Sequence, residues 1–158
     1  MGRYAVTTSV SVDKSKAEIE RILTRYGADD FFYGSKKKGN TAAIIAFSLA
    51  GKHVKFVLPL PNPDDFKSTP TGRRRRDVDG MFKAYEQACR QSWRALCLVI
   101  KAKLEAVESG ITTFEQEFLA HILLPNSQTV GEHILPMVEQ AYVDGKMPPL
   151  MLTFDEKK

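Results

Sequence analysis

A continuous apolar seam through residues 81–109 constrains the fold of this chain more than any other feature. Its members stand three or four positions apart and are Phe82, Tyr85, Cys89, Trp93, Leu96, Ile100, Leu104 and Val107. This spacing predicts one long helix with a single buried face. A helix of that length extends for about 43 Å, which exceeds the width of a small sheet. We therefore expect one end of the helix to project or to carry another element.

The segment before this helix has the alternation that is typical of strands. A β-branched run predicts a first strand over residues 4–12, and further strands are expected at 31–33, 43–49 and 54–58. The last two have matching apolar rows and a short turn between them, which predicts a hairpin with one buried side. Between the first two strands we expect a helix that ends at Gly27. Its apolar stripe is Ile19, Ile22, Leu23 and Tyr26.

Three segments have the form of a capping box, in which Ser or Thr precedes Glu by three residues: 15–18, 112–115 and 129–132. The first predicts that the early helix begins at Asp13 or Ser15. The other two predict two short helices after the long one. The second of these is expected to bend or break near Pro136 and to end at Gly145.

Together these elements predict a single α+β domain over residues 1–158. The order β-α-β-β-β favours a four-stranded, antiparallel-dominated sheet packed on the long helix and followed by a small C-terminal helical hairpin. The expected divisions are the sheet with its first helix at 1–61, a basic loop at 62–80, the long helix at 81–109, the acidic helical hairpin at 111–145 and a tail at 146–158.

Charge is distributed unevenly along the chain. Residues 1–103 hold 20 Lys or Arg against 10 Asp or Glu, whereas residues 104–145 hold seven acidic side chains and no Lys or Arg. A basic surface of this kind favours an acidic partner, and nucleic acid is the commonest one. The alternative is self-complementarity, in which the acidic part docks on the basic part of the same chain or of a neighbouring copy.

The basic residues supply the candidate site. Arginine forks suit phosphate oxygens, and a run of arginines lies in a loop long enough to be functional. A lysine run occupies a predicted turn at the sheet edge, and further cations lie on a strand and on the long helix. The nucleic-acid-binding candidates are Arg73, Arg74, Arg75, Arg76, Lys36, Lys37, Lys38, Lys55, Arg90 and Arg94.

Other kinds of site have no signature in the sequence. The three histidines are scattered and no Cys-x-x-Cys occurs, so we expect neither a metal site nor a cofactor. No phosphate loop and no nucleophile motif is present, so we expect a non-enzymatic protein, although an enzyme built from dispersed residues remains an alternative. No segment has the length and apolarity of a membrane span. Cys89 and Cys97 are expected to be small reduced residues, which suits a cytoplasmic protein.

Two stretches carry a family resemblance. The first is residues 9–28. The second consists of Trp93-Arg-Ala-Leu, residues 100–111 and Phe114-Glu-Gln-Glu-Phe-Leu-Ala-His. Through them the chain resembles a group of small uncharacterised proteins encoded by tailed phages and prophages. The resemblance implies a setting, the cytoplasm of a bacterial host cell during infection, and no catalytic residues.

Two functions are therefore expected to compete. The first is an accessory protein that binds nucleic acid in phage DNA replication or recombination. The second is a protein–protein interaction module that inhibits a host defence or polymerase complex, with a host or phage protein as its partner. Homo-oligomerisation is compatible with either function.

Overall fold

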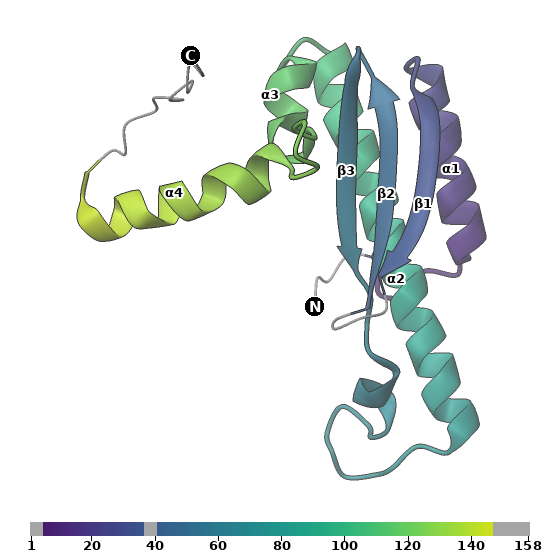
Figure 1. Cartoon of the computed structure of the whole chain (residues 1–158). Coiled ribbons are helices and arrows are strands. Elements are labelled where there is room, and N and C mark those ends of the chain that lie inside the picture. The colour runs from purple at the N-terminus through teal and green to yellow at the C-terminus, as the bar shows by residue number, and fades with distance from the viewer. Residues whose placement is uncertain (1–4, 37–40, 147–158) are drawn as a thin grey trace, which may run out of the picture.

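The computed structural model describes residues 5–36 and 41–146, and of Lys36 only the backbone. An antiparallel sheet of three strands, in the order β1-β2-β3, forms its centre: β1 (Asp29–Lys36), β2 (Ala42–Leu49) and β3 (Lys52–Pro59). Helices α1 (Val12–Arg25) and α2 (Val78–Glu108) lie against one face of this sheet, and no helix of the described residues covers the other face (Figure 1). The α+β class, the antiparallel sheet and the long helix are confirmed.

The core lies between the sheet and the two helices. Its sheet side consists of the inner rows that alternation predicts, with Ile45 opposite Phe56 and Phe47 opposite Val54. Strands β2 and β3 are joined by Ala50 and Gly51, both at positive φ, the conformation of the tight turn that matches the twist of a hairpin. The predicted hairpin is therefore confirmed. The helix side of the core is Ile19, Leu23, Trp93, Leu96, Cys97, Ile100 and Leu104.

The predicted first strand is wrong: residues 5–11 form turns and irregular backbone, so the described sheet has three strands instead of four. Ala5 has a positive φ, and its carbonyl accepts a hydrogen bond from the N–H of Thr8. The segment finds its partner in a side chain, because the amide of Gln87 on α2 donates to the carbonyls of Val6 and Thr8. β-Branched alternation alone does not supply the neighbouring strand that a ladder needs.

Helix α1 begins earlier than predicted. Ser11 is its N-cap, with an extended backbone and a hydroxyl that accepts from the N–H of Lys14. Ser15, the predicted cap, is instead fully buried inside the helix. The helix ends before Gly27, whose φ of +84° gives the predicted left-handed stop.

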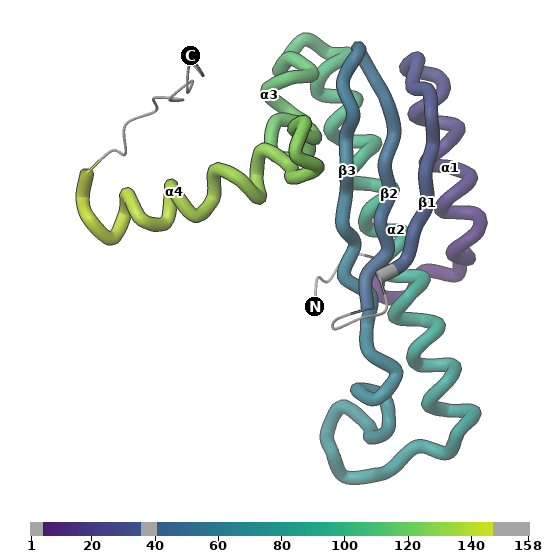
Figure 2. Tube along the Cα trace, in the orientation of Figure 1, coloured from purple at the N-terminus to yellow at the C-terminus, as the bar shows by residue number. Residues whose placement is uncertain are grey.

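Helix α2 spans 31 residues and begins at Val78, three residues before the predicted start, because the side chain of Asp77 caps its N-terminus. Its C-terminal part packs on the sheet, and its N-terminal part extends beyond the sheet, as Figure 2 shows. The exposure of the apolar seam changes accordingly along the helix: Ile100 has no exposed area, whereas Phe82 near the N-terminus is 56% exposed. The expectation that one end of this helix projects is confirmed.

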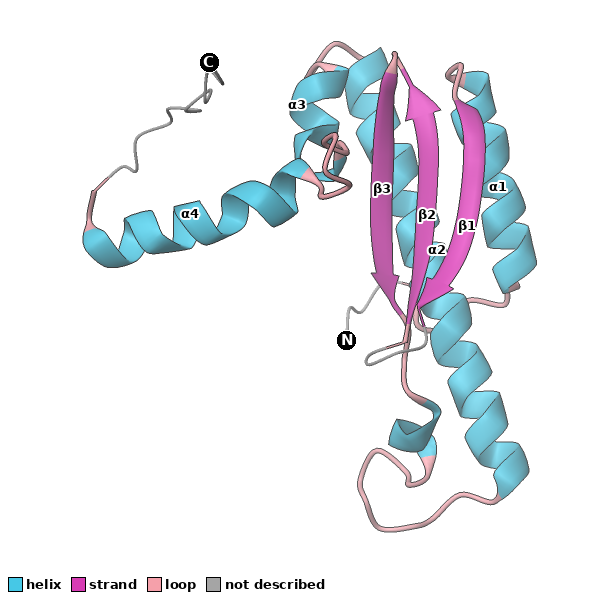
Figure 3. Ribbon diagram, in the orientation of Figure 1, coloured by secondary structure: helices cyan, strands magenta, loops and turns pink. Residues whose placement is uncertain are grey.

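The C-terminal part of the chain does not form the predicted helical hairpin. Helix α3 (Phe114–Phe118) has only five residues and continues into the 3₁₀ helix η2 (Leu119–His121). Helix α4 (Val130–Asp144) then points away from the sheet beyond β3 (Figure 3). It runs through Pro136 without a break and ends at Gly145. A hairpin needs two helices of comparable length packed side by side, and α3 is too short for this.

Of the two capping boxes in this region, one involves the predicted residues and the other does not. Thr129 and Glu132 form the predicted box at the start of α4. The box of α3 lies one residue later than predicted and joins Thr113 to Gln116. Gln serves as well as Glu in this motif, so adjacent threonines left two registers available.

Candidate nucleic-acid interface

The predicted basic loop lies at the projecting end of α2. The chain leaves β3 at Pro59, forms the short 3₁₀ helix η1 (Pro63–Phe66), and returns to α2 through residues 67–76, which we term the arginine loop. Figure 1 shows this loop and the start of α2 extending together from one end of the sheet. The predicted loop of 62–80 is thus shorter, because both of its ends belong to helices.

The arginine loop has a defined backbone. Ser68 pairs with Arg75 in an isolated antiparallel bridge, and the N–H of Thr69 donates to the carbonyl of Arg74 over 2.9 Å. The tip is a turn, in which the N–H of Gly72 donates to the carbonyl of Thr69 at 2.8 Å, with Gly72 at a φ of +69°. The arginines therefore follow a tight turn and are not part of a featureless linker.

Arg76 holds this loop together. Its Nη1 donates to the carbonyls of Phe66 and Ser68, at 3.2 and 2.6 Å, and its own N–H donates to the carbonyl of Lys67. The ring of Phe66 packs edge-on against Tyr85 of α2, with 6.2 Å between the ring centroids. Arg76 therefore has a structural role, and the phosphate-binding capacity of the loop rests on the arginines before it.

Arg73, Arg74 and Arg75 are exposed, and none of them forms an ion pair with a side chain of residues 5–35 or 41–146. Residues 66–76 hold five cations and no carboxylate. Lys67 is the exception at the base of the loop, because it pairs with Asp64 at 2.8 Å. Three adjacent guanidinium groups thus face solvent without a described counter-charge.

The lysine run follows the strand end nearest the same part of the molecule. Lys36 pairs with Ala42, and Ala42 pairs with Pro59, where the chain departs for the arginine loop. This row of three paired residues places the C-terminal end of β1 at the same end of the sheet as Pro59, from which the chain continues toward the arginine loop. Lys37 and Lys38 lie outside the residues that the structure describes, as does the side chain of Lys36.

The remaining candidates form contacts within the chain. Lys55 forms an ion pair with Glu132 of α4 at 3.2 Å, and Arg94 forms one with Glu18 of α1. Arg90 donates two hydrogen bonds to the side-chain oxygen of Gln87. These cations join elements of the fold, so the structure does not bring all ten candidates onto one surface.

A groove of about 440 Å³ lies beside the arginine loop, between the loop and α2. Phe66, Ser68, Thr69 and Arg76 line it from the loop side, and Gln87 lies on its helix side. The sequence did not indicate this groove, because its walls come from distant segments and only Arg76 of its lining belongs to the candidate arginine run. Its lining includes Asp65 and Arg76 but none of the three exposed arginines.

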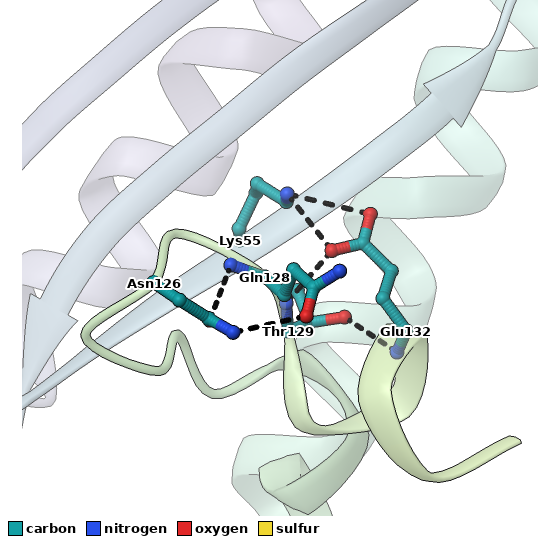
Figure 4. A network of polar contacts seen from close by, with 5 residues as sticks. All are labelled: Lys55, Asn126, Gln128, Thr129 and Glu132. Carbon is teal, nitrogen blue, oxygen red and sulfur yellow. Dashed lines mark hydrogen bonds and ion pairs between the residues drawn. The ribbon is translucent and has the colours of Figure 1, made fainter. Parts of the chain in front are cut away.

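The acidic part of the chain does dock on the basic part. Glu115 pairs with Lys52 at 3.1 Å, and Glu117 pairs with Lys103 at 3.0 Å. The pair of Glu132 with Lys55 is the third such link (Figure 4). Self-complementarity therefore accounts for these lysines, whereas it does not extend to the exposed arginines.

The described part of the chain also bears on metal-binding groups, thiols and membrane-spanning helices. No group of three or more His, Cys, Asp or Glu side chains there could hold a metal ion. Burial raises the pKa of both Cys89 and Cys97, which keeps each sulfur in its weakly nucleophilic thiol form. None of the helices in that part of the chain is long and apolar enough to cross a membrane.

Comparisons with protein-family models, with curated proteins and with solved structures found no match to this chain.

Proposed function

We propose that this protein binds nucleic acid through the arginine loop and acts as a non-enzymatic accessory protein. One observation carries the proposal: Arg73, Arg74 and Arg75 are adjacent, exposed and without a described carboxylate partner. Guanidinium groups donate paired hydrogen bonds to phosphate oxygens, and each phosphate that they neutralise releases a counterion.

The shape of the loop supports a backbone contact better than a base-specific one. The arginine loop extends beyond one end of the sheet (Figure 1), and the exposure of Arg73, Arg74 and Arg75 gives a strand of nucleic acid access to them. Most protein–DNA hydrogen bonds go to phosphate and sugar, and such contacts carry no sequence information. We therefore expect affinity with little sequence preference. A role in phage DNA replication or recombination rests on the family resemblance alone.

A polarisation titration of labelled single-stranded and duplex oligonucleotides tests the proposal. Affinity should fall with salt, and replacing Arg73, Arg74 and Arg75 by Ala should reduce the slope of log K against log salt by about 2 for single strands and about 3 for duplex. A matched control replaces the exposed Lys14, Arg21 and Lys101 by Ala, removing equal charge elsewhere. No binding near about 50 mM salt, or equal effects of the two variants, would contradict the proposal.

The second candidate function, a protein–protein interaction module, is favoured by helix α4. No residue of this helix is buried, and several of its apolar side chains face solvent. A pull-down from nuclease-treated bacterial lysate separates the two functions. A stoichiometric protein that is lost with a Val138→Glu variant would support the module, and nucleic acid recovered only without nuclease would support the first function.

A further inference from the structure

The groove between the arginine loop and α2 has the size and the lining of a ligand site. Its volume of about 440 Å³ lies within the range of about 300–1,000 Å³ that is typical of small-molecule pockets. Ala84 and Ala88 line it from α2, and their short side chains leave this space open between the helix and the loop. Phe66 adds an aromatic ring, and Pro70 adds further apolar surface. A lining of this kind suits a flat ring.

The polar part of the lining has hydrogen-bonding capacity that the fold does not use. Asp65 and Ser68 both line the groove. Within the described residues, neither the carboxylate of Asp65 nor the hydroxyl of Ser68 forms a hydrogen bond or an ion pair. Gln87 is engaged, in contrast, because its amide donates to the carbonyls of Val6 and Thr8. The groove therefore offers a ligand one carboxylate and one hydroxyl that no described side chain occupies.

The backbone of the arginine loop places the groove directly beside two of the exposed arginines. Ser68, on the lining, pairs with Arg75, and the N–H of Thr69, also on the lining, donates to the carbonyl of Arg74 over 2.9 Å. Opposite residues in an antiparallel pair have Cα atoms about 4.5–5.5 Å apart. Arg74 and Arg75 thus belong to the segment next to the one that lines the groove. A ligand that extends over both segments contacts the groove and the arginines at once.

The charges around the groove select the kind of group that fits inside it. Asp65 repels a phosphate or any other anion from the groove itself. The five cations of residues 66–76 repel a cationic side chain or a polyamine. A neutral group remains, and it has to donate hydrogen bonds, because a carboxylate only accepts them. A nucleobase is neutral and flat and has donors on its edge, so it meets all of these conditions.

Guanine suits a carboxylate better than the other bases do. Its N1–H and its 2-amino group are adjacent donors that match the two oxygens of a carboxylate. Cytosine and adenine have one amino group next to an acceptor nitrogen, and thymine has one N–H between two carbonyls, which a carboxylate repels. These edges are accessible only in an unpaired base, because base pairing occupies them in a duplex.

We propose that the groove binds one unpaired base, preferentially guanine, of a nucleic-acid strand whose phosphates contact Arg73, Arg74 and Arg75. The inference rests on the proposed function, and it adds one base contact to backbone contacts that carry no sequence information. The ring of the base packs against Phe66, and Asp65 accepts hydrogen bonds from its edge. Single strands are therefore preferred to duplex, in which the base first has to leave its pair.

Short strands that differ in a single base give the first test. Each strand consists of abasic deoxyribose phosphates, and only its central unit bears guanine, thymine or no base, so all strands carry the same charge. In polarisation titrations near about 50 mM salt, the guanine strand should bind at least about fivefold more tightly than the abasic strand, as base–aromatic stacking predicts. Equal affinities would refute the groove inference and leave the proposed function in place. If no strand bound, both would be wrong.

Filling the groove gives the second test. Ala84→Leu adds volume without changing charge, so it should bring the affinity of the guanine strand close to that of the abasic strand and leave the abasic strand unaffected. Ala102→Leu is the matched control, because Ala102 is exposed on the same helix and does not line the groove. A guanine strand that binds Ala84→Leu and Ala102→Leu equally well would place the base elsewhere.

Asp65→Asn keeps the size of the side chain and tests the base contact where Ala84→Leu fails to fold. It should reduce the preference for guanine over thymine at least about threefold, since the loss of one charged hydrogen-bond acceptor is involved. Asp64→Asn removes the same charge from a residue outside the lining and should keep that preference. A preference that Asp65→Asn does not alter would exclude the carboxylate from base recognition and overturn this assignment.

Competition with guanosine monophosphate identifies the source of the base. This nucleotide brings only one phosphate to the arginines, so it should displace the labelled guanine strand only at a far higher concentration than the unlabelled strand does. Displacement at similar concentrations would show that the groove serves a free nucleotide, and the proposal of a strand-borne base would then be wrong.

Discussion

The ammonium group of Lys55 on β3 lies 3.2 Å from the carboxylate of Glu132 in the first turn of α4. The same carboxylate accepts a hydrogen bond of 2.7 Å from the N–H of Thr129. The Thr129 N–H and, to a smaller extent, the Lys55 ammonium lower the pKa of Glu132. One side chain thus caps a helix and ties it to the sheet.

This pair predicts that Lys55 contributes to structure and little to nucleic-acid binding. In a double-mutant cycle, Lys55→Met and Glu132→Gln should show a coupling of about 0.5 kcal/mol in urea denaturation, as expected for an ion pair at the protein surface whose carboxylate remains half exposed. Gln keeps the acceptor that caps α4. The Lys55→Met protein should bind oligonucleotides within about twofold of the unmodified chain, which is about 0.4 kcal/mol. A large loss of affinity in Lys55→Met would contradict this prediction and would show that Lys55 takes part in nucleic-acid binding.

Arg76 should control the order of the arginine loop. Its guanidinium bonds two carbonyls of the loop, so Arg76→Gln leaves the carbonyls of Phe66 and Ser68 without that donor. We expect faster tryptic cleavage after Arg73, Arg74 and Arg75, because proteases act on segments that open locally. Peptide mapping over time measures the rate. Arg90→Gln, which removes an arginine from a helix instead, should not accelerate cleavage in the loop.

Periodic patterns predicted the parts of the fold that local geometry decides. The hairpin of β2 and β3 followed from two matching rows, and the ends of α1 and α4 followed from glycines that adopt a positive φ. The projection of α2 followed from its length. Each of these features depends on residues close together in sequence.

The errors concern features that depend on what lies next to a segment. Residues 5–11 alternate as a strand does, yet they contact Gln87 of α2 instead of a neighbouring strand. Arg94 and Arg76 carry the same side chain as Arg74. However, Arg94 forms an ion pair with Glu18, and Arg76 donates hydrogen bonds to backbone carbonyls. The sequence therefore identifies the basic residues. Only the tertiary contacts show which of them are exposed and which form interactions within the fold.

Phe118 should contribute strongly to the attachment of the C-terminal part of the chain. It has no exposed area and packs edge-on against Phe47 and Phe56 of the sheet. Phe118→Ala should lower the free energy of unfolding by about 3–5 kcal/mol, since a large buried ring is lost and a cavity is left. Phe82→Ala, from the exposed end of α2, should change it by about 0.5 kcal/mol or less. Equal effects in urea denaturation would contradict this packing.

His121 should make the stability of the protein sensitive to mildly acidic pH. Its ring stacks on Phe56 with 4.0 Å between the centroids. Burial first, and then the nearby Lys103 ammonium, lower the pKa of His121 below 6.5, against a backbone hydrogen bond to Lys55 that acts in the opposite direction. The unfolded chain therefore takes up a proton more readily than the folded chain. The stabilisation is complete above pH 6.5 and is lost as the pH falls from there through the folded pKa.

Urea denaturation at several pH values measures how the free energy of unfolding changes with pH, and His121→Gln should flatten this slope. The paired carboxylates Glu115 and Glu132 do not interfere, because their lowered pKa values confine their own losses to below pH 4.5. An unchanged slope in His121→Gln would assign the effect to another group.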